Sequence, residues 1–174
     1  QDTRIIDVGS GSGHFLHFLA NEGFRHVTGV EPFIPKTLRY PNGLSILKQK
    51  FTELEGQWDV IIFNHSFEHI PDNLETLRHA HKLLANNGWC VIEIPSVSSY
   101  AWRHYGIYWH QLDAPRHTFL HSLESFRILA LRSGHQTPVL PLWSLRIPLL
   151  QSLVRQLLLD SGLLMPLKAS PGAC

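Results

Sequence analysis

A short apolar run that ends in a glycine-rich turn constrains the fold of this chain more than any other feature. The run Ile5-Ile6-Asp7-Val8 precedes three closely spaced glycines and then an apolar-periodic stretch that begins near Phe15. This succession predicts a strand, a tight turn and a helix. Glycine lets a ligand approach the backbone of such a turn, and the helix behind it offers unpaired N–H groups and a positive dipole end. The turn is therefore predicted to bind a ligand.

Two details distinguish this turn from a dinucleotide-binding one. The dinucleotide fingerprint G-x-G-x-x-G needs a third glycine for close helix–strand packing. Here Gly9, Gly11 and Gly13 alternate, and His14 stands where that third glycine would be. Asp7 would repel a pyrophosphate, whereas it would attract a ligand that carries an ammonium and a sulfonium. An NAD-dependent oxidoreductase is therefore the less favoured alternative.

A second strand is expected over residues 27–30, and it ends in an acid, Glu31, about twenty residues past the glycines. An acid there can accept hydrogen bonds from both ribose hydroxyls. Together these residues resemble motifs I and II of the class I S-adenosylmethionine (SAM) methyltransferases. The resemblance implies a Rossmann-like, doubly wound, mostly parallel α/β sheet, with SAM as cofactor and S-adenosylhomocysteine as product.

The resemblance also implies which residues hold the cofactor. The methionine end is expected on Asp7 and the glycine turn, the ribose on Glu31, and the region near the sulfur on Asn64 and His65. Phe51 either packs on the adenine face or is a plain core residue. The complete set of expected cofactor-binding residues is Asp7, Gly9, Ser10, Gly11, Gly13, Glu31, Pro32, Phe51, Thr52, Asn64, His65 and Ser66.

Apolar runs and helical periods alternate along the chain, which predicts right-handed crossovers and a parallel sheet. The run at 58–64 is apolar on both faces, as a central parallel strand should be. A weak helical turn is expected around 36–40. The other expected strands are 3–8, 27–30, 44–48, 89–94 and 136–140, and the expected helices are 13–22, one that opens at Pro71-Asp72 and ends at Asn86-Asn87-Gly88, and 122–133.

The segment from about 96 to 120 is rich in aromatic residues and histidine, and it is predicted to be a substrate lid. Its run W-H-x-L-D-A-P-R-H, together with the "EH-hydrophobic-x-D" pattern at 68–72, resembles methyltransferases near the ubiquinone-biosynthesis O-methyltransferases. His117 is the first candidate for a general base, His110 the second, and Asp113 an orienting group. Alternatively, Arg116 and His117 pin the lid by hydrogen bonds.

We expect a single domain over residues 1–174, with a leucine-rich tail at about 142–174. The tail is expected to pack on the domain, with membrane-surface contact through 142–167 or dimer contact as alternatives. The helices that usually precede the first strand are absent, so the chain is either truncated or unusually minimal. A seventh strand is doubtful, because Pro166 would interrupt its candidate at 162–169.

Composition excludes several other classes of protein. The formal net charge is +1 without a dense basic run, which argues against a nucleic-acid partner. Two cysteines form no disulfide framework, and neither a signal peptide nor a membrane span is present, so a cytoplasmic protein is the default. Among twelve histidines, His65 and His69 lie four apart, but Ser66 replaces the glutamate that a metalloprotease helix needs. No metal site is predicted.

The chemistry expected is methyl transfer from SAM to a small-molecule acceptor, with a hydroxyl oxygen favoured. A SAM-binding protein without catalytic activity is the main alternative, because Lys50 stands where the family often has an adenine-binding aspartate, and a lysine cannot accept a hydrogen bond. The oligomeric state and the acceptor itself do not follow from the sequence.

Overall fold

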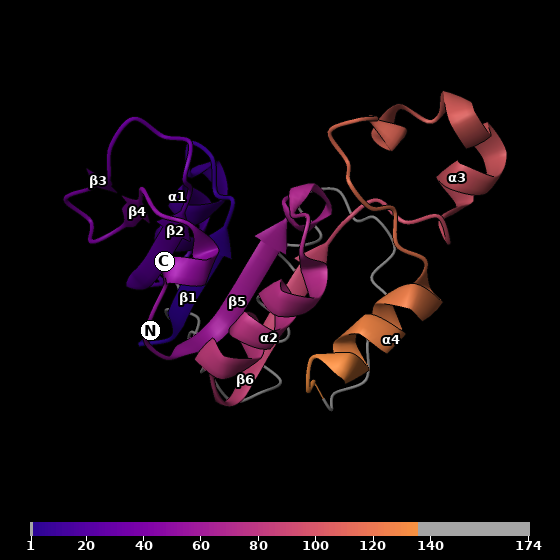
Figure 1. The fold of residues 1–174 in the computed structure, drawn as a ribbon. Helices are drawn as coiled ribbons and strands as arrows, with labels where there is room; N and C mark the ends of the chain where they lie inside the picture. Colours follow the sequence, from indigo (N-terminus) through magenta and orange to yellow (C-terminus); the bar gives the residue numbers. More distant parts are fainter. Residues whose placement is uncertain (1, 136–174) are drawn as a thin grey trace, which may run out of the picture.

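The protein is seen here in a computed structural model that describes residues 2–135, and these residues form an α/β domain (Figure 1). Six strands make one sheet in the order β3-β4-β2-β1-β5-β6, and every neighbouring pair is parallel except the antiparallel β3 and β4. The predicted mostly parallel sheet is therefore confirmed. The strands are β1 Arg4–Val8, β2 His26–Val30, β3 Leu38–Arg39, β4 Ser45–Leu47, β5 Trp58–Asn64 and β6 Leu84–Glu93, and the α-helices are α1 His14–Asn21, α2 Asn73–Leu83, α3 Tyr100–Tyr105 and α4 Leu123–Arg132.

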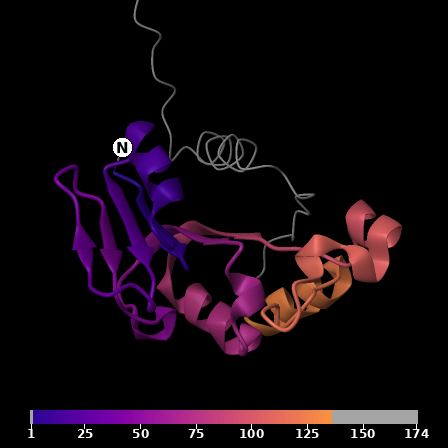
Figure 2. The ribbon, with the colours of Figure 1, turned by 90° about the horizontal axis from the view of Figure 1, so that it is seen from above.

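The sheet is doubly wound about β1. From β1 the chain proceeds outward through β2 to β4, then returns to pair β5 on the other side of β1 and continues to β6. Figure 2 shows α1 on one face of the sheet and α2 on the opposite face. The strand order thus reverses between β1 and β5, and ligands of open α/β sheets bind at the carboxyl ends of the strands at such a point.

The alternation of side chains along the strands divides the core between the two faces. Ile5 packs on one face with the apolar side of α1, and Ile6 packs on the other with the buried side of α2. In β5 the four central residues, Val60 to Phe63, are at most 1% exposed. The prediction of a central strand that is buried on both faces is confirmed.

Two local predictions were wrong. Residues 36–40 do not form a helical turn, because the turn at Asn42-Gly43 folds the chain back and pairs Leu38 with Ile46 of β4. The strand expected at 89–94 begins earlier, at Leu84, and α2 ends at Leu83. The pairing of β5 with β6 absorbs the extra residues at a register irregularity, from Trp58 opposite Leu84 to Val60 opposite Trp89.

The segment that was predicted as a lid, 96–120, leaves the sheet after β6 and returns beside its own start. The backbone N–H of Val97 donates to the carbonyl of His121 over 3.2 Å, and the Ser96 hydroxyl donates to the same carbonyl. Between these ends lie α3 and the short turns η3 Gly106–Tyr108 and η4 His110–Leu112, which Figure 1 shows standing apart from the sheet. Tyr108 is 86% exposed.

The predicted strand at 136–140, the leucine-rich tail and the candidate seventh strand lie outside the described residues. Within residues 2–135, the structure contains no helix with the length and apolar character needed to cross a membrane.

Candidate active site

The glycine turn after β1 adopts a backbone conformation that suits glycine. Gly9, Gly11 and Gly13 have φ values of +74°, +52° and +82°, and the Gly9 N–H donates to the Val30 carbonyl at the end of β2 over 2.8 Å. A Cβ added at Gly11 would meet no atom within 4 Å. The space beside the Gly11 backbone is thus open.

Close packing around the turn excludes side chains at its other glycines. A Cβ at Gly9 would lie 2.5 Å from the Cβ of Ser66, and one at Gly13 would lie 2.6 Å from Ile46. The sequence analysis missed Gly29 in β2, where a Cβ would lie 2.3 Å from the Ser10 hydroxyl. The position of Gly29 inside an apolar strand could have indicated this contact, because glycine there often marks the close approach of a ligand or another part of the chain.

Asp7 is a buried carboxylate directly ahead of the turn. Its side chain is 2% exposed, and its Oδ1 atom has no hydrogen-bond partner among the described residues. Burial, with a smaller contribution from the charge of Glu31, raises the pKa of Asp7 to about 8. A charged donor placed beside this carboxyl group would satisfy the oxygen and favour its ionised form.

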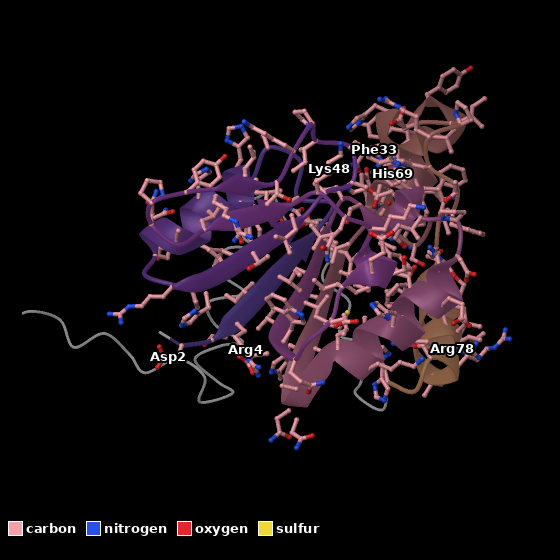
Figure 3. The ribbon with its side chains drawn as sticks, turned by 60° about the vertical axis from the view of Figure 1, so that its left-hand side comes forward. Asp2, Arg4, Phe33, Lys48, His69 and Arg78 are labelled. Carbon is pink, nitrogen blue, oxygen red and sulfur yellow. The ribbon has the colours of Figure 1, made fainter. Side chains whose placement is uncertain are left out.

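Glu31 is fixed at the end of β2 by two backbone groups. Its Oε2 accepts from the Gly11 N–H over 3.1 Å, and its Oε1 accepts from the Phe33 N–H over 3.0 Å. Pro32 is half-buried and Phe33 is 92% exposed. Figure 3 shows Phe33, Lys48 and His69 at the end of the sheet opposite Arg4, which is the end where the parallel strands finish.

Phe51 and Thr52, the residues expected on the adenine side, differ in burial. Phe51 is 7% exposed and packs in the core on the α2 face, with ring contacts to Phe63 and His79. This is the core position that the sequence left as one of two alternatives. Its neighbour Thr52 is exposed.

Three predicted residues, Asn64 to Ser66, lie at the end of β5 or directly after it, and their surroundings differ. The hydroxyl of Ser66 donates to the Val8 carbonyl over 2.5 Å, so it ties β5 to β1. Asn64 has a buried Oδ1 without a partner in the described structure. His65 has a positive φ of 50° and lies with its ring nitrogens 3.6 Å from Glu68 and 3.5 Å from Glu93. These two carboxylates, Glu68 first, raise the pKa of His65 to about 9.

His117 of the lid lies close to Glu68 in the short helix η2, Phe67–His69. Its side chain is 8% exposed, and its Nε2 lies 3.8 Å from Asp113 Oδ2 and 4.0 Å from Glu68 Oε1. Arg116 also binds Asp113 over 2.6 Å and lowers the pKa of that carboxyl group. His110 is exposed in η4, and in the described part of the chain no hydrogen bond or ion pair joins its side chain to the residues above.

The returning end of the lid is attached to η2, Phe67–His69. The N–H and the hydroxyl of Thr118 both donate to the Glu68 carbonyl over 2.9 Å. His69 Nδ1 lies 2.9 Å from the Arg116 carbonyl, and its ring contacts that of His117. The attachment therefore uses Thr118 and the Arg116 carbonyl.

The structure thus brings Asp7, the glycine turn and Glu31 together, and a second group forms around His65 and His117. The second group includes two residues that the sequence analysis assigned no role, Glu68 and Glu93. Glu68 lies within the recognised signature, and Glu93 is opposite Asn64 in the β5–β6 register. Glu68, His69 and His117 each offer a ligand atom, all within 4.8 Å of one another, so they could hold a metal ion.

Comparison with known proteins identifies relatives over most of the described chain. Residues 1–137 match the sequence model of a family described as "Methyltransferase domain". A ubiquinone biosynthesis O-methyltransferase of Bordetella avium is 28% identical over 101 residues, which are 51% of this chain and 41% of that protein. The chain therefore matches about two fifths of the length of this curated relative.

Solved structures show the same fold. The magnesium protoporphyrin IX methyltransferase of Synechocystis, solved with bound S-adenosylhomocysteine, has a TM-score of 0.59 at 16% identity, over 76% of this chain and 64% of that one. A SAM-dependent methyltransferase of Archaeoglobus fulgidus has a TM-score of 0.58 at 17% identity, over 90% and 80% of the two chains.

Proposed function

The chain belongs to the methyltransferase domain family, and on that premise we propose that it moves a methyl group from SAM to a hydroxyl oxygen of a small molecule. The family resemblance identified in the sequence is thereby confirmed. When bound, SAM supplies a methyl group on a cationic sulfur, which the protein has to align with a nucleophile. The name of the Bordetella avium relative, an O-methyltransferase, supports the choice of oxygen.

The observation that carries the proposal is the buried carboxyl group of Asp7 beside the open backbone of Gly11. An unpaired buried oxygen is costly unless a ligand supplies a donor, and the ammonium of SAM is such a donor. The open space at Gly11 lets the methionine end lie on the main chain. A pyrophosphate would instead meet the carboxyl group of Asp7, which disfavours a dinucleotide.

The other residues at this end of the sheet supply the remaining cofactor contacts in the proposal. Glu31 accepts two backbone N–H groups and retains lone pairs for the ribose hydroxyls. Ser10 and Pro32 border the same turn, and the exposed Thr52 borders the adenine. Asn64 and His65 lie near the sulfur, whereas Ser66 shapes the turn through its bond to Val8.

His117 is proposed to take the proton of the acceptor hydroxyl. As the oxygen–carbon bond forms and the carbon–sulfur bond breaks, the hydroxyl proton passes to the imidazole. The two carboxylates at 3.8 and 4.0 Å, Asp113 and Glu68, stabilise the resulting imidazolium. His110 is the second candidate for this role.

Two measurements test the proposal. Calorimetric titration with SAM, S-adenosylhomocysteine and NAD should show binding of the first two, and Asp7→Ala should abolish it. Turnover against a panel of phenols, acids and amines should then reveal a hydroxyl acceptor, and His117→Ala should lower turnover far more than cofactor affinity. Binding of NAD in place of SAM would refute the cofactor, and binding without turnover on any acceptor would indicate a catalytically silent protein.

A further inference from the structure

The point at which the lid returns to the sheet gathers two imidazoles and a carboxylate. Glu68 and His69 come from η2, whereas His117 comes from the lid, 48 residues later in the chain than His69. Figure 3 labels His69 at the end of the sheet where this contact lies. Sequence spacing could not reveal the group, because its members meet only when the lid folds back.

We propose that Glu68, His69 and His117 form a binding site for a divalent transition-metal ion such as Zn²⁺ or Co²⁺. The inference goes beyond the proposed function; the binding of the ion does not depend on that function, whereas its expected effect on methyl transfer does.

The distances suit coordination better than hydrogen bonding. His117 Nε2 lies 4.0 Å from Glu68 Oε1, beyond hydrogen-bond range, and all three ligand atoms lie within 4.8 Å. Ligands held about 2.0–2.1 Å from a tetrahedral Zn²⁺ are separated from one another by about 3.4 Å. Side-chain movements of about an ångström would therefore bring the three atoms to this spacing, with the fourth position left to water.

The hydrogen bond of His69 is an independent indication. Its Nδ1 lies 2.9 Å from the Arg116 carbonyl, which can only accept, so Nδ1 carries the proton and Nε2 presents a lone pair. Metal-binding histidines commonly donate their other ring N–H to a carbonyl or carboxylate in this way. Asp113, 3.8 Å from His117 Nε2, places a second carboxylate next to the site.

Burial leaves one oxygen of the site without a partner among the described residues. Glu68 is 1% exposed and its Oε2 has no partner among the described residues. His65, 3.6 Å from Oε1, approaches the other oxygen of the same carboxylate. A buried carboxylate oxygen without a donor is explained by an ion more readily than by an apolar neighbour.

The donor set selects the kind of ion. Two imidazoles and one carboxylate suit Zn²⁺, Co²⁺, Fe²⁺ or Mn²⁺, whereas Mg²⁺ and Ca²⁺ prefer all-oxygen sites. A bound metal ion would occupy the imidazole of His117, which is the proposed acceptor of the hydroxyl proton. We therefore expect the ion to inhibit methyl transfer and a chelator to restore it.

The test uses the full chain, freed of metal with a chelator. Co²⁺ titration should produce visible absorption that saturates at one equivalent, and Zn²⁺ should displace it. Glu68→Gln, His69→Ala and His117→Ala should each weaken Co²⁺ binding by about tenfold or more. His104→Ala and His26→Ala, at exposed histidines outside the group, are matched controls that should bind as the wild type does.

Two further measurements keep the test decisive. Cu²⁺ bound to the wild type should show electron-paramagnetic coupling to two nitrogens, which needs no variant that has to fold. Absence of saturable Co²⁺ binding, coupling to a different number of nitrogens, or an equal loss in the control variants would overturn the site. S-adenosylhomocysteine affinity, measured in parallel, separates failure of this site from failure of the proposed function.

Discussion

Replacing Asp7 by asparagine should stabilise the ligand-free protein while removing its ability to bind the cofactor. The carboxyl group is 2% exposed, has an oxygen without a partner in the described structure, and has a pKa of about 8. Burial is the main cause of that rise, and Glu31 adds to it. An amide of the same shape has no charge to desolvate, so the folded state no longer bears this cost.

The magnitude follows from proton linkage. The pKa rises from an ordinary 3.8 to about 8, and each pKa unit corresponds to about 1.4 kcal/mol. Because an acid with a raised pKa binds its proton more tightly in the folded state, stability is unaffected below about pH 4 and falls as the pH rises towards 8. The linkage cost is roughly 4 kcal/mol at pH 7 and roughly 6 kcal/mol above pH 9.

Urea unfolding of the wild type and of Asp7→Asn at pH 5, 7 and 9 measures this directly. The advantage of the variant should grow with pH over this range. Asp59→Asn is the matched control, because Asp59 lies in the same sheet but binds Arg4 over 3.0 Å at the opposite end of the strands. That change should lower stability and leave cofactor binding intact.

Binding supplies the second half of the prediction. At pH 7 the wild type should release close to one proton when S-adenosylhomocysteine binds, since the ligand ammonium favours ionised Asp7. Calorimetry in two buffers of different ionisation enthalpy measures that proton. Asp7→Asn should release none and should bind at least about thirtyfold more weakly. A wild type that releases no proton, or a variant that binds as tightly as the wild type, would refute the reasoning.

Four other changes test the geometry of the turn, of the sheet and of a helix cap. Gly29→Ala should destabilise the fold by roughly 1–3 kcal/mol in urea unfolding, because its Cβ would lie 2.3 Å from the Ser10 hydroxyl. Gly11→Ala should cost only about 1 kcal/mol of backbone strain yet lower S-adenosylhomocysteine affinity, since its Cβ enters the open space over the turn; equal affinity would contradict a ligand there. Glu31→Gln should weaken nucleoside binding about tenfold in calorimetry by removing a charge-assisted acceptor. Asp72→Ala should cost about 1 kcal/mol of stability, because Asp72 accepts from the Glu75 N–H as the cap of α2, and it should leave binding unchanged.

The strand and the glycine turn of the proposed cofactor site could be predicted from the sequence because their parts are local. Asp7 and the turn with its alternating glycines lie within seven consecutive residues. The turn needs positive φ values, and glycine is the residue that adopts them readily. Glu31 followed from the length of one strand–helix–strand unit. The role of Gly29 was missed because it depends on a close contact with Ser10, which lies in the turn after the neighbouring strand β1.

The errors in the fold have the same origin. The segment 36–40 has little pattern of its own, and its pairing with β4 decides its conformation. The early start of β6 depends on β5. Leu84 pairs with Trp58 of β5, and this pairing replaces another turn of α2. Both outcomes are tertiary effects that override local propensity.

The two ends of the site differ because they depend on different kinds of contact. On the proposed cofactor side, the contacts are local: the backbone of the glycine turn and one buried acid, Asp7, which has an oxygen without a partner in the described structure. On the acceptor side, His117 reaches Glu68 only through a lid whose return is set by contacts about 50 residues apart, such as Thr118 with Glu68. Changes in lid residues should therefore alter acceptor chemistry and metal binding while leaving cofactor affinity intact. The proton measurement at Asp7 and the Co²⁺ titration at Glu68 address these two ends separately, and neither requires the acceptor to be known.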